Sequence, residues 1–433
     1  MSIKNLTVAH ISDTHIGYEA YRVLSPKGNN LRGEDIARAF ALSVNQIIEQ
    51  DPPLVIHSGD IADRPGLQIR QIIFIKQQLE RLAGIRSDGT RRQVVVISGN
   101  HDQPSSRKEA CFLELFRGIP GIHIVTNEYS KITFDKIEDN MSSELEDVVV
   151  HTLPHDVLKI VNFSEVTPVP GKINILTSHG VAGGSELYVK SLGREFAIPT
   201  EVLGRDWEYV ALGHWHKQGP VSIVGRSISG KDQDRCKVWY AGSTENMGFG
   251  DLRDNGEKRG WLLVEIAKNE LPLVHRKYVS IRNIIRFPDI EAENLSSTEI
   301  TNAIIANIEN SNHEGAVLGQ VVREVNRDSW AMLEIKNIFD AAKKAIHIEI
   351  TPKFKKMTYE GFKDAASNSI EDLLTESATI LLEESSRKGA INLALELINE
   401  SRRKGMSRDD NKDTIVESNV SKYEATEKGN IDA

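Results

Sequence analysis

The sequence predicts an α/β protein, followed along the chain by a small α+β domain and a C-terminal pair of helices. Three observations predict this class. Short apolar runs of the buried-strand type recur at residues 6–11, 54–58, 94–98, 173–178 and 209–212. Helical patterns follow two of these runs, at residues 67–82 and 105–116. Each run also ends in a polar motif, so the expected strands deliver polar side chains at their carboxyl ends.

The polar motifs carry candidate metal ligands. They are Asp13-Thr14-His15, Gly59-Asp60, Gly99-Asn100-His101-Asp102, His179-Gly180 and Gly213-His214-Trp215-His216. Loops at the carboxyl ends of strands in an open α/β sheet are free to converge on one site. Carboxylate, amide and imidazole groups without a thiolate suit Mn²⁺, our first expectation, or Mg²⁺ or Fe²⁺, better than a structural zinc. Asp60 is the candidate bridge between two such ions, which together would activate a water for attack on a phosphate ester, with His101 assisting the leaving oxygen.

In this order the motifs resemble those of the calcineurin-like metallophosphoesterase superfamily. The resemblance implies a sandwich of two mixed β-sheets flanked by helices. It assigns one metal ion to Asp13, His15 and His216, the second ion to Asn100, His179 and His214, and the bridge to Asp60. It makes His101 the acid or phosphate contact, and Asp63 and Arg64 are further candidates for contact with the phosphate. His123, His151 and His155 match no motif position and are expected to be ordinary polar residues.

A later segment resembles one branch of this superfamily. Residues 240–245, Tyr-Ala-Gly-Ser-Thr-Glu, followed by Lys-Arg-Gly-Trp at 258–261, are similar to the meiotic-recombination-eleven and SbcD-type nucleases of DNA double-strand-break repair. The resemblance implies a Mn²⁺-dependent 3′–5′ exonuclease and single-strand or hairpin endonuclease. It also implies DNA ends as substrate, an SMC-like ABC ATPase as partner, and a homodimer formed by the helices at 67–82 and 105–116. The sequence departs from that branch at Asp63, where many members carry His.

Two other interpretations stay open. A phosphatase or cyclic-nucleotide phosphodiesterase explains the metal motifs but leaves the later part of the chain without a purpose. A DNA-end-tethering scaffold with weak nuclease activity explains the later part but makes the complete ligand set superfluous.

We expect the chain to be divided at four boundaries. The expected parts are a nuclease domain at 1–274, a capping domain at 275–352, a linker at 353–368, a helical region that binds the ATPase at 369–404, and a disordered tail at 405–433. In the helical region, apolar residues repeat at helical spacing and are candidate partner contacts. These are Leu373, Leu374, Leu381, Leu382, Leu395 and Ile398. The alternative for this region is packing against the chain's own cap.

Composition limits the partners and the location. The 433 residues carry a net charge of −9, so binding to DNA must come from local basic patches. The candidate patch is Arg226, Lys231, Arg235 and Lys237, although a solvated loop is the simpler interpretation of such charges. The chain begins without the apolar stretch of a signal peptide, shows no membrane span, and has only Cys111 and Cys236. These features predict a cytoplasmic protein that acts at the chromosome.

Overall fold

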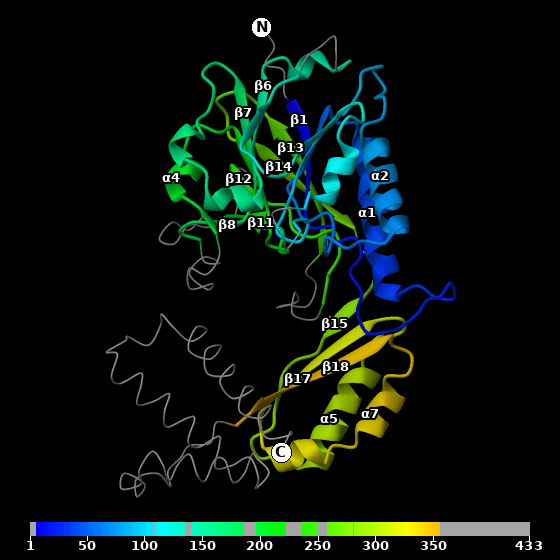
Figure 1. Cartoon of the computed structure of the whole chain (residues 1–433). Coiled ribbons are helices and arrows are strands. Elements are labelled where there is room, and N and C mark those ends of the chain that lie inside the picture. Colours follow the sequence, from blue (N-terminus) through cyan, green and yellow to red (C-terminus); the bar gives the residue numbers. More distant parts are fainter. Residues whose placement is uncertain are drawn as a thin grey trace, which may run out of the picture. The chain divides into compact units, whose positions relative to one another are not determined.

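The computed structural model describes residues 6–104, 106, 109–134, 140–185, 196–221, 236–248, 258–279 and 281–355. Its first part contains two six-stranded mixed sheets packed face to face (Figure 1). This confirms the predicted fold class of two mixed sheets with flanking helices. Each of the five apolar runs forms a strand within a residue or two of the predicted bounds.

The first sheet has the strand order β14-β13-β1-β2-β3-β4. Its strands are β1 (Leu6–Ile11), β2 (Leu54–His57), β3 (Gln93–Ile97), β4 (Ile122–Val125), β13 (Arg259–Ile266) and β14 (Leu273–Val279). Strands β1 to β4 are parallel, whereas β13 pairs antiparallel with β1 and β14. Because side chains alternate along a strand, Val8 packs toward the second sheet, and Ala9 packs toward the helices.

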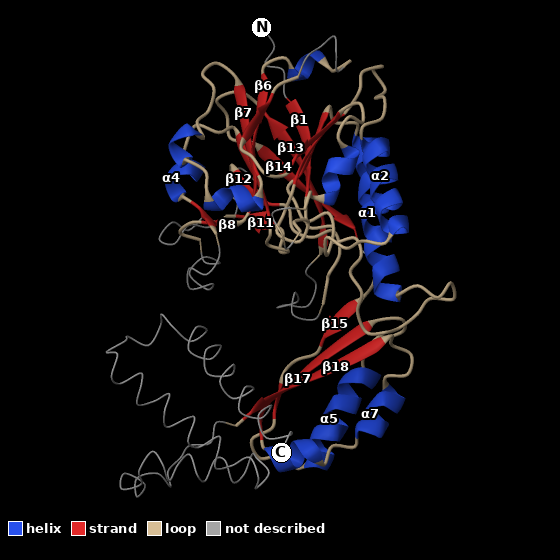
Figure 2. Ribbon diagram, in the orientation of Figure 1, coloured by secondary structure: helices blue, strands red, loops and turns tan. Residues whose placement is uncertain are grey.

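Two long helices cover the outer face of the first sheet (Figure 2). Helix α1 (Leu31–Gln50) begins at Asn30, whose side chain accepts a hydrogen bond from the Gly33 amide. Helix α2 (Ile69–Leu82) begins with a capping box between Gln68 and Gln71. The helix predicted at 105–116 is wrong for the residues described there, because only the 3₁₀ helix η1 (Phe112–Phe116) forms.

The second sheet has the order β11-β12-β10-β7-β6-β5. Its strands are β5 (Ser130–Ile132), β6 (Val148–Leu153), β7 (Ile173–His179), β10 (Tyr209–Gly213), β11 (Gly219–Pro220) and β12 (Val238–Tyr240). Strands β6, β7, β10 and β12 are parallel. Short elements pack on its outer face, namely η3 (His155–Lys159), η4 (Phe163–Glu165), α4 (Thr200–Leu203) and the paired strands β8 (Val181–Ala182) and β9 (Ala197–Ile198). The 3₁₀ helix η2 (Ser143–Leu145) instead contributes Leu145 to the core between the two sheets.

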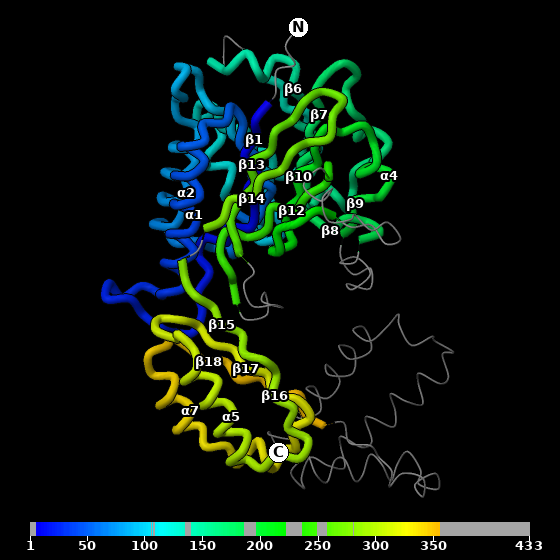
Figure 3. The backbone as a smooth tube through the Cα atoms, turned by 180° about the vertical axis from the view of Figure 1, so that it is seen from behind, coloured from blue at the N-terminus to red at the C-terminus, as the bar shows by residue number. Residues whose placement is uncertain are grey.

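A third, smaller sheet follows, with its own apolar core. Its strands are β15 (Ile284–Arg286), β16 (Ile290–Glu291), β17 (Val317–Val325) and β18 (His347–Phe354), and its helices are α5 (Ser297–Glu309), α6 (Arg327–Ala331) and α7 (Ile335–Ala341) (Figure 3). All strand pairs in this sheet are parallel, which the sequence did not predict. Strand β14 crosses the boundary expected at residue 274.

A buried ion pair connects this region with α1. Both guanidinium nitrogens Nε and Nη2 of Arg282 donate to the carboxylate of Asp35, and Nη1 donates to the carbonyl of Gly315 at 2.7 Å. Asp35 is 1% exposed and also pairs with Arg32. A bidentate pair of this kind offsets part of the cost of burying a carboxylate.

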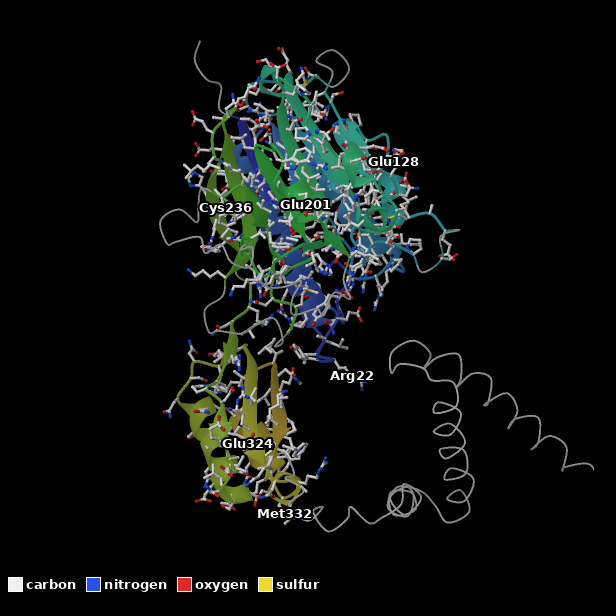
Figure 4. All side chains as sticks on the ribbon, turned by 90° about the vertical axis from the view of Figure 1, so that its left-hand side faces the viewer. Arg22, Glu128, Glu201, Cys236, Glu324 and Met332 are labelled. Carbon is white, nitrogen blue, oxygen red and sulfur yellow. The ribbon has the colours of Figure 1, made fainter. Side chains whose placement is uncertain are left out.

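Two further observations bear on the sequence predictions. Cys111 and Cys236 are both free thiols; Cys236 is labelled in Figure 4. Among the residues that the structure describes, no helix is both long enough and apolar enough to cross a membrane. The residues beyond 355, which include all six predicted partner contacts, lie outside the described part of the chain.

Candidate metal centre

The predicted ligands meet where the two sheets bring their strand ends together. Asp13, Asp60 and Asn100 follow the parallel strands β1, β2 and β3 of the first sheet. His179 ends β7, and His214 follows β10, in the second sheet. The tertiary fold therefore assembles one cluster from five loops.

The backbone at several of these positions is in the left-handed region. The φ angles are +50° at Asp13, +44° at His15, +53° at Asp60 and +98° at His214. Such conformations cost about 1 kcal/mol or more each for a residue with a side chain, and they concentrate at functional sites. The loops are therefore held in strained shapes that direct these side chains toward one another.

One half of the cluster surrounds Asn100. The Oδ1 atom of Asn100 lies 3.1 Å from His179 Nε2 and 3.1 Å from His214 Nδ1. Asp60 Oδ2 lies 3.2 Å from His179 Nε2. His179 Nδ1 donates to the Ser58 carbonyl at 2.7 Å, and since a carbonyl can only accept, Nε2 is the ring nitrogen that faces the cluster and would be the one to ligate an ion.

The other half surrounds His15. Its Nε2 atom lies 3.1 Å from His216 Nε2, 3.8 Å from Asp60 Oδ2 and 3.9 Å from Asp13 Oδ1. Two imidazole nitrogens this close require a proton or a cation between them. Asp60 is adjacent to both halves, as the predicted bridge must be.

These distances fit a divalent-metal centre. Oxygen and nitrogen ligands held ~2.1 Å from an octahedral ion are ~3 Å from their neighbours, which matches the spacings around Asn100 and between His15 and His216. Three groups could each hold an ion: Asp13 with His15 and His216, His15 with Asp60 and His101, and Asp13 with Asp60 and His179. The ligand atoms are oxygen and nitrogen, with no thiolate, which suits Mn²⁺, Mg²⁺ or Fe²⁺.

The electrostatics of the cluster also favour a cation. Burial alone would lower the pKa of His179, but the charge of Asp60 and the hydrogen bond to it raise that pKa to about 9. Burial likewise opposes ionisation of Asp60, yet His179 holds the pKa of Asp60 well below its usual range. The buried carboxylates therefore draw positive charge into the cluster.

Glycine is required where the ligand loops touch. A Cβ atom on Gly99 would lie 2.1 Å from Asp60 Oδ1 and 2.5 Å from the Asp60 amide nitrogen. At Gly59, where φ is +92°, a Cβ atom would lie 2.5 Å from His179 Nδ1. The glycines of the two motifs thus permit the close approach of β2, β3 and β7 loops.

Asp102 holds two of the ligand loops together by hydrogen bonds to their backbone. This fully buried carboxylate accepts hydrogen bonds from the amides of Ala62 and Gly99, each at 2.9 Å, and of Ile61 at 3.3 Å. Burial, and next the charge of Asp60, raise the pKa of Asp102 to about 6. Its hydrogen bonds fasten the loop after β2 to the loop after β3, so Asp102 positions ligands.

His101 and Asp63 lie together beside His15. His101 is exposed, its Nδ1 donates to the Asp63 carbonyl at 2.7 Å, and its amide donates to Asp60 Oδ1 at 2.8 Å. The Nε2 atom of His101 is therefore the one available to a substrate. The Asp63 carboxylate lies 3.5 Å from His15 Nδ1, the position of an outer carboxylate that orients a ligating histidine. Arg64, the next residue, is exposed.

The structure does not bring Lys237 to this cluster. It precedes β12, at the end of the second sheet opposite to His214, and its Nζ donates to the Arg205 carbonyl at 2.8 Å. The other three members of the predicted basic patch, Arg226, Lys231 and Arg235, lie outside the described residues.

Sequence reasoning missed His155. This residue is 7% exposed, and its ring centroid lies 6.1 Å from those of His179 and His214. Burial, and next the charge of His179, lower the pKa of His155. Because His155 occupies no motif position, nothing in the sequence pattern could have placed it beside the ligands. His123 and His151 hydrogen bond elsewhere, to Gln93 and to Asn174.

The fold and the cluster together are those expected of a calcineurin-like phosphoesterase domain. Residues 6–218 match the sequence model of the calcineurin-like phosphoesterase family, and this part of the chain belongs to that family. The family implies a divalent-metal centre, and the residues described above supply suitable groups.

Individual proteins similar in sequence to this chain belong to one kind of DNA repair protein. The chain is 25% identical over 323 residues to the DNA double-strand break repair protein Mre11 of Methanocaldococcus jannaschii, which covers 73% of this chain and 76% of that protein. It is 25% identical over 298 residues to Mre11 of Methanococcus maripaludis, covering 66% and 70%. It is 22% identical over 395 residues to Mre11 of Archaeoglobus fulgidus, covering 87% and 80%.

Proposed function

We propose that the protein is a Mn²⁺-dependent DNA nuclease of double-strand-break repair, a 3′–5′ exonuclease and single-strand or hairpin endonuclease. The observation that carries the proposal is the cluster of two carboxylates, one amide and four imidazoles at the junction of two sheets. The similarity to proteins named Mre11 supports DNA as the substrate.

The proposed roles follow from the contacts. Asp13, His15 and His216 would hold one ion, Asn100, His179 and His214 the other, and Asp60 would bridge them. Two such ions, when bound, supply Lewis acidity toward a phosphate and make water a stronger nucleophile at neutral pH.

The remaining residues act around the phosphate. The His101 Nε2 atom is open on the exposed side, and once protonated it would donate to the leaving oxygen. Because the Asp63 carbonyl accepts from Nδ1 of the same ring, His101 keeps one orientation. Asp63 also orients His15, and exposed Arg64 would contact a phosphate oxygen.

We further propose the order of parts that the sequence predicts, a nuclease, a cap, a linker, and a region at 369–404 that binds an SMC-like ABC ATPase. The first boundary falls after β14, beyond residue 274, and the second falls after β18, beyond residue 352. Exposed apolar residues support a homodimer. Ile69 and Ile73 on α2 are 75% and 49% exposed, and Leu115 on η1 is 65% exposed. Sedimentation of the full chain, compared with an Ile69→Lys variant, tests this association. The proposed location is the cytoplasm, at the chromosome.

The nuclease is tested with end-labelled linear duplex and hairpin DNA, with Mn²⁺ and with or without the ATPase. We expect Asp60→Asn and His101→Ala to abolish digestion. Matched controls are Asp147→Asn, whose side chain is 73% exposed, and His275→Ala on β14. Hydrolysis of p-nitrophenyl phosphate without digestion of DNA would favour a phosphatase. DNA binding without either reaction would favour a tethering scaffold.

A further inference from the structure

A row of rings extends from the candidate ligands to the surface. The His155 ring lies 6.1 Å from the His214 ring and is tilted by 31° relative to it. The Phe196 ring lies 5.8 Å from the His155 ring at an interplanar angle of 78°. The Phe196 ring is therefore no more than about 12 Å from that of His214, within the reach of a nucleotide whose phosphate is at the cluster.

The backbone fixes Phe196 relative to His179. The Phe196 carbonyl accepts a hydrogen bond from the Val181 amide at 3.3 Å, two residues beyond His179. The next residue, Ala197, pairs with Val181 in the short parallel ladder of β8 and β9. A Cβ atom on Gly180 would lie 3.2 Å from the Phe196 carbonyl, so these two segments are in close contact.

One side of the Phe196 ring is occupied and a large part is open. The Lys159 ammonium lies 4.7 Å from the ring centroid, and Asp156 holds that ammonium at 2.7 Å. Phe196 is nevertheless 42% exposed. An exposed aromatic ring that is held in place by a buried neighbour and a cation is suited to serve as a stacking platform for a base.

We propose that Phe196 stacks on the nucleobase adjacent to the scissile phosphate, so that the site prefers nucleoside esters over other phosphodiesters. This inference rests on the proposed nuclease function and names the part of the substrate that the metal ligands do not contact. Since every base has a π-face, the preference is for the presence of a base and does not depend on its sequence. His155 and Lys159 hold the ring in place.

The kinetic test compares two diesters with the same leaving group, thymidine 5′-(p-nitrophenyl) phosphate and methyl p-nitrophenyl phosphate, on the full chain with Mn²⁺. We expect wild type to have the lower KM for the nucleoside ester. In Phe196→Leu that preference should fall roughly 5- to 100-fold, and Phe196→Tyr should restore it. Phe339→Leu, which removes another exposed ring (55%), is the matched control.

A binding test needs no turnover. Fluorescence anisotropy in EDTA compares an oligothymidylate with an abasic oligonucleotide of equal length, which carries the same phosphates. We expect Phe196→Leu to weaken binding of the oligothymidylate relative to the abasic strand, and Phe196→Tyr to retain it.

Both tests separate the two proposals. Equal handling of the paired ligands by wild type, or an unchanged ratio in Phe196→Leu, would overturn the stacking while leaving phosphodiester hydrolysis intact. Loss of the preference in both Phe196→Leu and Phe196→Tyr would assign Phe196 a packing role only. Absence of DNA digestion in the test of the nuclease would refute that function, and the anisotropy ratio would then still decide the stacking.

Discussion

Replacing Gly99 with alanine should displace the bridging carboxylate. The added Cβ atom would lie 2.1 Å from Asp60 Oδ1, whereas ordinary contact begins at 3.4 Å, so this oxygen must move by about 1.3 Å. A rotation of the side chain alone cannot relieve the clash, because the Asp60 amide nitrogen is also only 2.5 Å away. The same movement would break the hydrogen bond that Asp60 Oδ1 accepts from the His101 amide.

The displacement sets the expected magnitude. A misplacement of ~1 Å in a catalytic array can cost ~100-fold in rate, or ~2.7 kcal/mol of barrier. We therefore expect kcat/KM of Gly99→Ala for methyl p-nitrophenyl phosphate with Mn²⁺ to fall ~100-fold. Calorimetric titration should show weaker Mn²⁺ binding, and overpacking should lower the free energy of unfolding by ~1–3 kcal/mol.

Gly66→Ala is the matched control for this substitution. Gly66 lies in the loop after β2 that carries Asp60, and a Cβ atom there has nothing within 4 Å. We expect this variant to keep the wild-type kcat/KM and Mn²⁺ affinity. If Gly99→Ala is folded and stays within twofold of wild type, the bridging position of Asp60 is misassigned.

Three further predictions concern polar contacts. Asp63→Asn removes the charge beside His15 Nδ1, 3.5 Å away, and should weaken Mn²⁺ binding ~10-fold in a calorimetric titration. Arg282→Met leaves the buried Asp35 carboxylate with fewer partners, and should lower the urea-derived free energy of unfolding by ~2–3 kcal/mol. Burial lowers the pKa of His151 to about 4, below its unfolded value of 6.5, so protonation favours the unfolded chain and stability is lost as pH falls from 6.5 to 4. His151→Gln should reduce that pH slope, which is at most ~1.4 kcal/mol per pH unit for one proton.

Each of these has a result that would contradict it. An unchanged dissociation constant for Mn²⁺ in Asp63→Asn would show that the Asp63 carboxylate does not orient His15. Arg282→Met is compared with Lys76→Met, which breaks an exposed pair with Glu80 and should cost less than ~1 kcal/mol; equal losses would place Arg282 among ordinary surface charges. Identical slopes for His151→Gln and wild type between pH 4.5 and 7 would show that His151 is not neutral in the fold.

Much of the cluster could be predicted from the sequence because each ligand follows its strand directly. Once residues 54–58 are recognised as a strand, Asp60 must lie at its carboxyl end, and the same reasoning places Asn100 and His214. What places these ends together is the parallel pairing of β1 to β3 and of β7 with β10, which apolar runs typically indicate.

The conformation at residues 105–116 and the position of His155 depend on tertiary contacts, which the local sequence pattern does not predict. The apolar spacing at 105–116 predicted a helix, but Cys111 is extended, with ψ 136°, and its thiol donates to the Asp102 carbonyl at 3.3 Å. Cys111 is therefore not helical, and the 3₁₀ helix begins only at Phe112. His155 reaches the cluster only because η3 packs against the end of β7, where its Nδ1 atom lies 3.3 Å from the His179 carbonyl oxygen.

The assembly of ligands from both sheets has a consequence for the order of events during folding. Asp13, Asp60 and Asn100 belong to one sheet, His179 and His214 to the other, and about 200 residues of chain separate the first from the last. Closing such long loops is slow and entropically costly, so an ion cannot nucleate this fold as zinc nucleates a zinc finger. Capture of the metal must follow the docking of the two sheets. A bound ion then stabilises the docked arrangement of the two sheets, by an amount that increases with the concentration of the free ion.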